Sequence, residues 1–283
     1  MSISNLSVTV ESARKAAAGI VPAVERAAAI LNYLQANADT AACTVTKIAI
    51  ALGLHKSNCS NILRTLESAS LVEYDPNSKS YMLGAALIGL GATATRRRDI
   101  LQMGQRPIEN LVRQTGLSCV TFAQLPDKSF LIIAGCDSDK EIKVTIDVGQ
   151  YFAPGTPALA RIVMATMSPG DIDAYIDQYC QPQFTAATKT GRSTIYQEIE
   201  QIRACGYAIS QGEYYAGNTA IVAPVFTAQD DVCRGICLIG FTSQMNKDDL
   251  PLLGEQVRNT AQIITQAVGG HYKLSDAACG QKP

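Results

Sequence analysis

The sequence predicts an α+β protein in two parts, a winged helix-turn-helix followed by a larger domain with an antiparallel sheet. The first part is predicted by a short helix that stops at Gly53, a second amphipathic helix three residues later, and two strand-like runs around a turn-rich loop at 75–79. The second part is predicted by strand-like and helical segments that mix from residue 99 onward and close with a pair of apolar runs. Such a mixture is typical of an α+β domain.

The domain layout follows from chain length and charge. The 283 residues suit two domains of ordinary size. Residues 1–98 hold ten Lys or Arg and six Asp or Glu, a balance of +4, whereas the remaining fourteen and nineteen give −5. A basic head and an acidic body fit a DNA-binding head on a domain that avoids DNA. We expect a disordered arm at 1–20, the winged helix-turn-helix at 21–84 and a linker helix at 85–98. The second domain is expected at 99–270, followed by a disordered tail at 271–283.

The helix-turn-helix is the most informative stretch. Its first helix, Thr46–Leu52, ends before Gly53, because Gly tolerates the left-handed backbone of a helix C-terminus. The second helix opens at Ser57, a good N-cap. Its apolar residues recur at intervals of three and four, at Cys59, Ile62, Leu63 and Leu66.

The opposite face of the second helix carries hydrogen-bonding side chains of the kind that read base edges and phosphates, and it has no acid between Lys56 and Leu66. Short helix-turn-helix patterns also arise by chance in helical proteins, but the polar face and the following hairpin favour DNA binding. The candidate DNA-contacting residues are Thr46, Lys56, Ser57, Asn58, Ser60, Asn61, Arg64 and Lys79.

Two helices flank this motif. A helix from Pro22 to about Gln35 completes the three-helix core, because Pro suits the first turn of a helix. Its expected buried stripe is Val24, Ala27, Ile30, Leu31 and Leu34. After the wing, the linker helix runs from Leu83 to about Thr95, and Ile100–Gln114 begins the second domain.

The second domain opens with a strand pair, Cys119–Ala123 and Phe130–Ala134. Apolar residues then alternate with polar ones from Ile142 to Val148, which predicts a half-buried strand. Further helices are expected at Pro157–Met167, Asp171–Tyr179, Thr194–Cys205 and Lys247–Val268, and further strands at Thr219–Phe226 and Arg234–Phe241.

Cysteine usage and hydropathy exclude several classes of protein. The nine Cys form no C-x-x-C pair, so neither a disulfide framework nor a zinc site is expected, and no metal or cofactor is predicted. No segment resembles a signal peptide, and the longest weakly polar run, Met82–Thr95, is too short to cross a bilayer. We therefore expect a cytoplasmic protein without membrane contact.

The sequence also gives no support for catalysis. The only two His are His55, in the helix-turn-helix, and His271, in the expected tail. No nucleophile elbow, phosphate loop or dinucleotide fingerprint is present. Asp171, Asp173 and Asp177 are interpreted as helix-dipole partners. A lone base at Glu213 would lack a nucleophile or metal, so we expect Glu213 to cap a loop or order a pocket, and we assign no catalytic residue.

Two motifs about 140 residues apart resemble the IclR family of transcriptional regulators. In the first half, Leu54-His55-Lys56-Ser57 leads into Leu63-Arg64-Thr65-Leu66, and Tyr81-Met82-Leu83-Gly84 closes the wing. In the second half, Arg203-Ala204-Cys205-Gly206-Tyr207-Ala208 is followed by Glu213, Gly217 and Ile221-Val222-Ala223-Pro224. The similarity covers roughly residues 21–268. It implies a one-component regulator with a GAF-like effector-binding domain.

The resemblance also implies partners. A homodimer would read a pseudo-palindromic double-stranded operator with half-sites about one helical turn apart, and a pairing of two dimers is left open. Family members usually carry Arg where Asn61 stands, so the operator is expected to differ at that base pair. The alternatives are a small-molecule-converting enzyme with a vestigial DNA-binding head and an interaction module that has lost its ligand.

The expected effector is a small organic acid, with an apolar or aromatic body. Thr156 is a plausible N-cap, and Pro157 at the first helical position has no N–H. The free N–H donors of this helix start are therefore those of Ala158 and Leu159, which can bind a carboxylate at the positive end of the helix dipole. The resemblance places effector contacts at this same helix start, although Pro154-Gly155 replaces the family's usual His-containing lead-in. Carried over from the family, the remaining pocket positions are Ser210, Ala220, Cys237 and Ile239.

Overall fold

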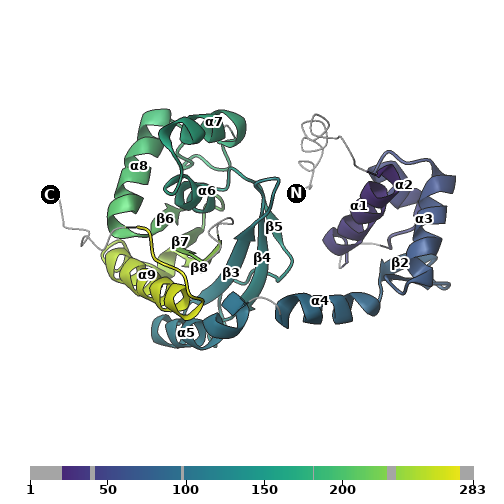
Figure 1. The fold of residues 1–283 in the computed structure, drawn as a ribbon, viewed down its shortest axis with the longest axis horizontal. Coiled ribbons are helices and arrows are strands. Elements are labelled where there is room, and N and C mark those ends of the chain that lie inside the picture. The colour runs from purple at the N-terminus through teal and green to yellow at the C-terminus, as the bar shows by residue number, and fades with distance from the viewer. Residues whose placement is uncertain (1–20, 39–41, 97–98, 181, 228–233, 275–283) are drawn as a thin grey trace. The chain divides into compact units, whose positions relative to one another are not determined.

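The computed structural model describes residues 21–38, 42–96, 99–180, 182–227 and 234–274 (Figure 1). The chain separates between residues 97 and 98 into two compact units, and each is described by itself. The predicted arm and the last nine residues of the predicted tail lie outside the described residues.

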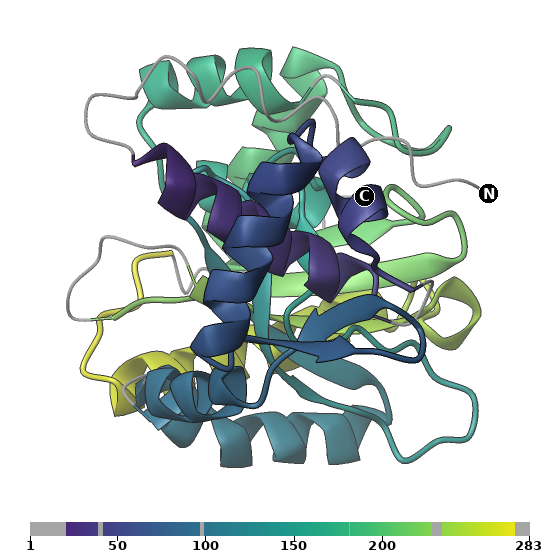
Figure 2. The same cartoon turned by 90° about the vertical axis from the view of Figure 1, so that its right-hand side faces the viewer.

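The N-terminal unit is a winged helix-turn-helix, as predicted. It contains the helices α1 (Pro22–Ala36), α2 (Val45–Ala51) and α3 (Lys56–Ser68) and the antiparallel strands β1 (Val72–Asp75) and β2 (Ser80–Leu83). Figure 2 shows purple α1 crossing blue α3, and these helices are in contact. Their shared core consists of Ile30, Leu34, Cys43, Ile48, Ala49, Cys59, Leu63, Leu66, Val72 and Tyr81.

Two local expectations in this unit need correction, and a third is confirmed. Val24 does not belong to the buried stripe of α1, because its side chain is 66% exposed near the helix start. Ser57 is not an N-cap: α3 begins at Lys56, and His55 occupies the cap position without a side-chain hydrogen bond. Gly53 adopts the expected left-handed backbone, with φ of 62°.

Helix α4 (Ala86–Arg96) follows the wing at the position predicted for a linker helix. Its apolar residues are not all covered, because Ile88 is 75% exposed and Leu90 is 60% exposed. The apolar spacing in this segment therefore correctly predicts a helix but overstates how much of it is buried.

The C-terminal unit is built on one antiparallel sheet with helices on both faces (Figure 1). The sheet order is β5-β4-β3-β8-β7-β6. The strands are β3 (Ser118–Gln124), β4 (Phe130–Cys136), β5 (Tyr151–Phe152), β6 (Ala208–Gln211), β7 (Asn218–Val225) and β8 (Arg234–Phe241). The helices are α5 (Asp99–Thr115), α6 (Pro157–Met164), α7 (Pro169–Tyr179), α8 (Arg192–Cys205) and α9 (Leu250–Ala267), and the short 3₁₀ helix η2 (Thr242–Gln244) follows β8.

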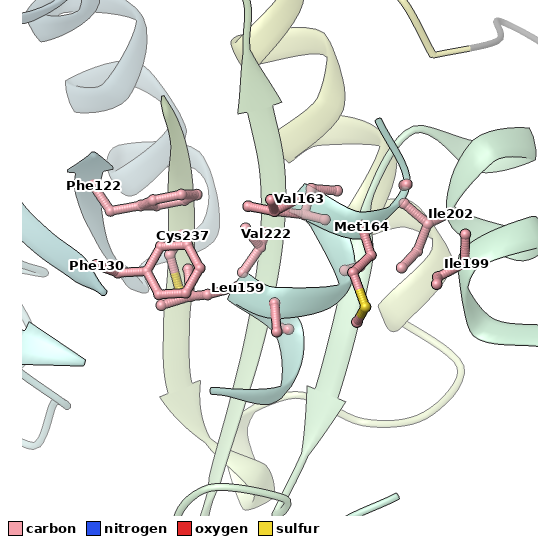
Figure 3. Close-up of a cluster of buried hydrophobic side chains, with 14 of the residues drawn as sticks. Phe122, Phe130, Leu159, Val163, Met164, Ile199, Ile202, Val222 and Cys237 are labelled. Carbon is pink, nitrogen blue, oxygen red and sulfur yellow. The ribbon is translucent and has the colours of Figure 1, made fainter. Parts of the chain in front are cut away.

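Two hydrophobic cores lie on opposite faces of this sheet. One packs α5 and α9 against the sheet, through residues such as Leu111, Leu238 and Val257. The other packs α6, α7 and α8 against it. Figure 3 shows this second core: Leu159 and Val163 lie near Val222, while Met164 points toward Ile199 and Ile202. Helix α6 is thus held between the sheet and α8.

The strand predicted at Ile142–Val148 does not form. Ile142 and Val148 are 72% and 63% exposed, and the backbone joins β4 only later, where the Gly149 N–H donates to Ile132 O at 2.8 Å. Of the four alternating apolar residues, only the middle two, Val144 and Ile146, are partly buried. The alternation does not ensure that the backbone pairs with a neighbouring strand.

Other differences are smaller. The sequence analysis missed the edge strand β6, which pairs with β7. Helix α6 ends at Met164, three residues before the expected end, and α9 begins at Leu250 instead of Lys247. Residues 271–274, which belong to the predicted tail, contact the fold: Leu274 is buried, and the Tyr272 hydroxyl donates to Gly206 O at 2.8 Å.

Candidate functional site

The outward face of α3 presents the side chains predicted to contact DNA. Of the residues of α2 and α3 that are predicted to contact DNA, five are exposed: Thr46, Lys56, Ser57, Asn61 and Arg64. The other two, Asn58 and Ser60, are half-buried. Leu63 and Leu66 on the other side belong to the core, so burial of one face fixes which side chains face outward. The helix is therefore positioned by its apolar residues, and its polar residues are available to a partner.

The wing presents Lys79 at the end of a structured turn. Asp75 accepts hydrogen bonds from the Asn77 N–H at 2.9 Å and from the Ser78 hydroxyl at 2.5 Å. Lys79 has φ of 52° and an exposed side chain. The hydrogen bond from Ser78, the largest cause, and that from the Asn77 N–H lower the pKa of Asp75. The ionised Asp75 carboxylate thus holds the turn of the wing through these hydrogen bonds.

A cavity of about 210 Å³ lies in the C-terminal unit between the sheet and the start of α6. All seven residues predicted to contact an effector line it: Thr156, Ala158, Leu159, Ser210, Ala220, Cys237 and Ile239. The structure thus brings together residues of α6, β6, β7 and β8 that are far apart in the sequence. None of the residues that line the cavity has an ionisable acidic or basic side chain of the Asp, Glu, Lys, Arg or His type.

The start of α6 directs unpaired donors at this cavity. Thr156 occupies the N-cap position, but its hydroxyl donates to Ala153 O at 2.8 Å and does not cap the helix, contrary to expectation. The first intrahelical bond is from the Ala160 N–H to Thr156 O, at 2.8 Å. Helix geometry therefore leaves the N–H groups of Ala158 and Leu159 without an intrahelical acceptor.

The lead-in to α6 is fixed by its contact with α7. The Tyr175 hydroxyl donates to Pro154 O at 2.8 Å. Gly155 lies directly against the carbonyl of Tyr179, and a Cβ at this position would overlap with that oxygen. The Pro154-Gly155 sequence, which departs from the family pattern, therefore lets this turn pass close to the end of α7.

The cavity wall includes residues that the sequence analysis did not assign to it. Phe152, Tyr214 and Tyr215 line it, and the Tyr214 ring lies 5.5 Å from that of Phe152 and 4.8 Å from that of Phe184. Val144 and Ile146, from the segment wrongly predicted as a strand, also line the cavity. Tyr214 directly follows Glu213 of the family motif, and this adjacency was available as a signal, whereas Phe152 lies four residues after the end of the 142–148 segment.

Two protonated groups contribute to the polarity of the wall. Burial raises the pKa of the Cys237 thiol to about 12. Burial, followed by the neighbouring Tyr215, raises the pKa of Tyr214 to about 12. Both groups therefore remain neutral at physiological pH, and the cavity contains no thiolate nucleophile.

Glu213 is held in a buried ion pair. Its Oε1 accepts from Arg161 Nη2 at 2.5 Å, and its Oε2 accepts from the Lys189 N–H at 3.2 Å. These bonds agree with the expectation that Glu213 orders a loop. Among the acids of α7, Asp171 lies in the first turn, as expected of a helix-dipole partner, and accepts from the Ser168 hydroxyl at 2.6 Å. Asp173 and Asp177 differ from expectation, because both pair with Arg192 of α8.

The described residues offer no metal site and no membrane span. Within them, no group of three or more His, Cys, Asp and Glu side chains could hold a metal ion. The seven cysteines that the structure describes have free thiols. Over the same part of the chain, every helix is too short or too polar to cross a bilayer.

Both units match known family models. The IclR helix-turn-helix domain matches residues 23–76, and the C-terminal domain of bacterial transcriptional regulator IclR matches residues 92–266. The regulator XynR of Escherichia coli K12 is 24% identical over 250 residues, which cover 88% of this chain and 98% of XynR. The repressor AllR of the same strain is 24% identical over 247 residues, covering 87% and 90% of the two chains.

Solved structures share the fold. An IclR transcriptional regulator from Alicyclobacillus acidocaldarius superimposes with a TM-score of 0.81 at 27% identity, covering 89% of this chain and all of the other. An IclR homologue from Microbacterium hydrocarbonoxydans, complexed with 4-hydroxybenzoate, gives a TM-score of 0.72 at 17% identity, covering 87% and 99%. Since the two family models match most of the chain in the predicted order, this protein belongs to the IclR family of DNA-binding transcriptional regulators, which are not enzymes.

Proposed function

We propose that a small organic acid binds in the cavity of the C-terminal unit and changes the affinity of α3 for operator DNA. The observation that carries this proposal is the cavity itself, which is lined at one end by the first turn of α6. Because linkage is reciprocal, operator DNA would change the affinity for the acid by the same factor. The proposed effector contacts are Thr156, Ala158, Leu159, Ser210, Ala220, Cys237 and Ile239.

A carboxylate is the favoured polar group for electrostatic reasons. The N–H groups of Ala158 and Leu159 lie at the positive end of the helix dipole. No acidic side chain lines the cavity to repel an anion, and no basic side chain there competes with the helix start. Within the cavity, the start of α6 is therefore the place where an anion would be most stabilised.

An apolar and preferably aromatic body is favoured by the rest of the wall. Phe152, Tyr214, Ile132, Val222 and Ile239 are among the lining residues. The cavity of about 210 Å³ is smaller than the roughly 300–1,000 Å³ of pockets for drug-sized ligands, which favours a single ring. Support comes from the Microbacterium relative, whose structure contains 4-hydroxybenzoate.

On DNA, we propose a homodimer that reads a pseudo-palindrome through α3 and the wing. The proposed contacts are Thr46, Lys56, Ser57, Asn58, Ser60, Asn61, Arg64 and Lys79. Two copies of α3 related by a dyad would enter successive major grooves about one helical turn apart. Analytical ultracentrifugation with and without an operator duplex tests the assembly, and a monomer bound to a single half-site would contradict it.

Calorimetry with matched acids and amides tests the effector. The ligands are benzoate, phenylacetate and 4-hydroxybenzoate, each compared with its amide. We expect each acid that binds to do so at least about tenfold more tightly than its amide, about 1.4 kcal/mol, because the amide lacks the charge that the helix start stabilises. Equal binding of an acid and its amide would contradict the proposal.

A variant pair locates the anion. Leu159→Pro removes one donor at the start of α6 and should abolish the preference for the acid. Gly170→Pro removes one donor from the first turn of α7, at the second helical position, where the glycine has open space around it, and should leave the preference unchanged. Loss of the preference in both variants would mean that the effect is not specific to α6.

A further inference from the structure

The loop between β6 and β7 forms one wall of the cavity. It turns through a short set of backbone bonds: the Gly212 N–H donates to Asn218 O at 2.8 Å, and the Asn218 N–H donates to Tyr215 O at 3.0 Å. Tyr214 and Tyr215 in this loop line the cavity, and Tyr215 is also 55% exposed. The loop therefore lies between part of the cavity and solvent.

A buried ion pair ties this loop to α6. Glu213 immediately precedes the two tyrosines, and its side chain is 2% exposed. Arg161, whose side chain is 4% exposed, donates to it at 2.5 Å. The same guanidinium donates through Nε to Pro157 O at 3.1 Å, in the first turn of α6. One arginine thus contacts both the helix start proposed to hold the anion and the loop that carries the aromatic wall.

Three further contacts place the loop from its other side. Thr185 Oγ1 donates to Gly212 O and Thr188 Oγ1 to Glu213 O, each at 2.7 Å. The Lys189 N–H donates to the second carboxylate oxygen of Glu213 at 3.2 Å. Glu213 is therefore the point where the loop, α6 and the segment before α8 meet.

The charges in this cluster balance. Arg161 also donates to Glu198 at 2.8 Å, and Lys189 Nζ pairs with Glu198 at 2.6 Å, so two cations face two carboxylates. A buried pair of this kind adds little net stability, because desolvation offsets most of the attraction. Removing Arg161 would leave the Glu213 carboxylate buried with only the Lys189 N–H as partner, whereas removing the Glu213 charge leaves Arg161 paired with Glu198. The pair therefore specifies one position of the loop more than it stabilises the fold.

We propose that Arg161 and Glu213 form a latch that holds the Tyr214 and Tyr215 wall over the cavity and thereby sets how long a ligand stays bound. The inference rests on the proposed function, because it takes the cavity to be the effector site. Both residues are positioning residues. Neither lines the cavity, so the latch acts on ligand exchange through the loop and leaves the anion-binding donors of α6 in place.

Glu213→Gln tests the latch with little change in shape. Glutamine has one acceptor oxygen, whereas Glu213 faces two N–H donors, so one of the two contacts must be lost. Hydrogen–deuterium exchange of the ligand-free protein should accelerate about tenfold or more at the Gly212 and Asn218 amides. Glu200→Gln is the matched control, because it removes the exposed ion pair with Arg203 elsewhere on α8. The control should leave exchange at both amides unchanged.

Ligand kinetics supply the second readout. Dissociation of 4-hydroxybenzoate, or of the tightest acid in the calorimetric series, should be about tenfold faster from Glu213→Gln. The ratio of acid to amide affinity should stay as in the unmodified protein, since α6 still offers its donors. Unchanged exchange, or faster exchange with an unchanged dissociation rate, would overturn the latch.

Two provisions keep the result interpretable. If Glu213→Gln does not fold, Arg161→Met combined with Glu213→Leu removes both charges and fills the space with apolar atoms, and the same increases in exchange and dissociation are expected. If no acid binds the unmodified protein, the proposed function fails, and exchange in the ligand-free protein still decides whether the ion pair holds the loop.

Discussion

Helices α3 and α6 offer different kinds of group to a partner. At α3, the groups available to a partner are side chains on an exposed face, above a core formed by the other face of the same helix. At α6, all eight residues are buried, and the groups proposed to meet a ligand are the backbone N–H donors of the first turn, which lines the cavity. The partner of α3 approaches from solvent, whereas a partner of α6 must enter the fold.

At α3, a substitution on the outer face can change binding without changing stability, whereas at α6 a substitution changes both. Arg64 is exposed beside Leu63, which is fully buried, so a change on the outer face of α3 leaves the core intact. Leu159, in contrast, both lines the cavity and belongs to the core around Phe122 and Val163 (Figure 3). A substitution at α6 therefore alters packing and binding together.

The largest expected effect is that of Gly155→Ala, directly before α6. A methyl group there overlaps with the carbonyl of Tyr179, so α6 or α7 must move. We expect a loss of unfolding free energy at or above the upper end of roughly 1–3 kcal/mol, the usual cost of overpacking, and loss of acid binding. Chemical denaturation and calorimetry measure both effects.

Gly170→Ala is the control for this substitution. Gly170 lies in the first turn of α7 with open space around it, so alanine should be neutral or stabilise the helix by up to about 1 kcal/mol. If Gly155→Ala unfolds no more easily than Gly170→Ala, the approach of the lead-in to α7 does not constrain the cavity.

Asn61→Ala should affect binding without affecting stability. Asn61 is exposed on α3, and an asparagine suits adenine in the major groove. We expect specific operator affinity to fall by about 1–3 kcal/mol, affinity for random DNA to change little, and unfolding free energy to stay within about 0.5 kcal/mol. Anisotropy titrations with operator and scrambled duplexes measure the difference. Equal weakening on both duplexes would show that Asn61 does not read a base.

The same contrast explains what the sequence could predict. The signals that predict the winged helix-turn-helix are local. Gly53 ends one helix, the apolar spacing from Cys59 to Leu66 predicts the next, and residues 75–79 form the turn. Each signal acts within a few residues, and the structure has these elements in the predicted order. The two errors, Ser57 as a cap and Val24 as a buried residue, each concern one residue near the start of a helix.

The cavity depends on contacts that no local pattern contains. The family resemblance identified Ser210, Ala220, Cys237 and Ile239, but nothing in their spacing shows that they share a wall with Leu159. Of the alternating apolar residues of 142–148, only Val144 and Ile146 are partly buried, and whether such a segment becomes a strand depends on a partner with free backbone groups. Arg161 was missed because its partners, Glu198 and Glu213, lie 37 and 52 residues away.

Removing single cations near α3 and the wing should change affinity on all DNA sequences to a similar extent. Lys56, Arg64 and Lys79 are exposed and are proposed to lie near phosphates. For each alanine variant, the slope of log affinity against log salt should become shallower by about one unit, because one phosphate contact releases about 0.9 counterions. Lys247→Ala removes an exposed cation from the C-terminal unit and is the control. An unchanged slope for all three variants would mean that another face meets DNA.

The smallest effect concerns the ionisation of Asp75 in the wing. Hydrogen bonds from the Ser78 hydroxyl and the Asn77 N–H lower the pKa of Asp75 in the folded protein. A depressed folded pKa contributes stability above the unfolded value, near 3.9, and this contribution is lost as pH falls through the folded pKa. The wing should therefore keep its geometry at physiological pH and loosen only below about pH 4. NMR titration of the Asn77 and Ser78 amides measures the folded pKa, and Ser78→Ala, which removes the largest cause, should raise it toward the ordinary value. A folded pKa at or above the ordinary value would show that Asp75 does not order the turn, and the position of Lys79 would then need another explanation.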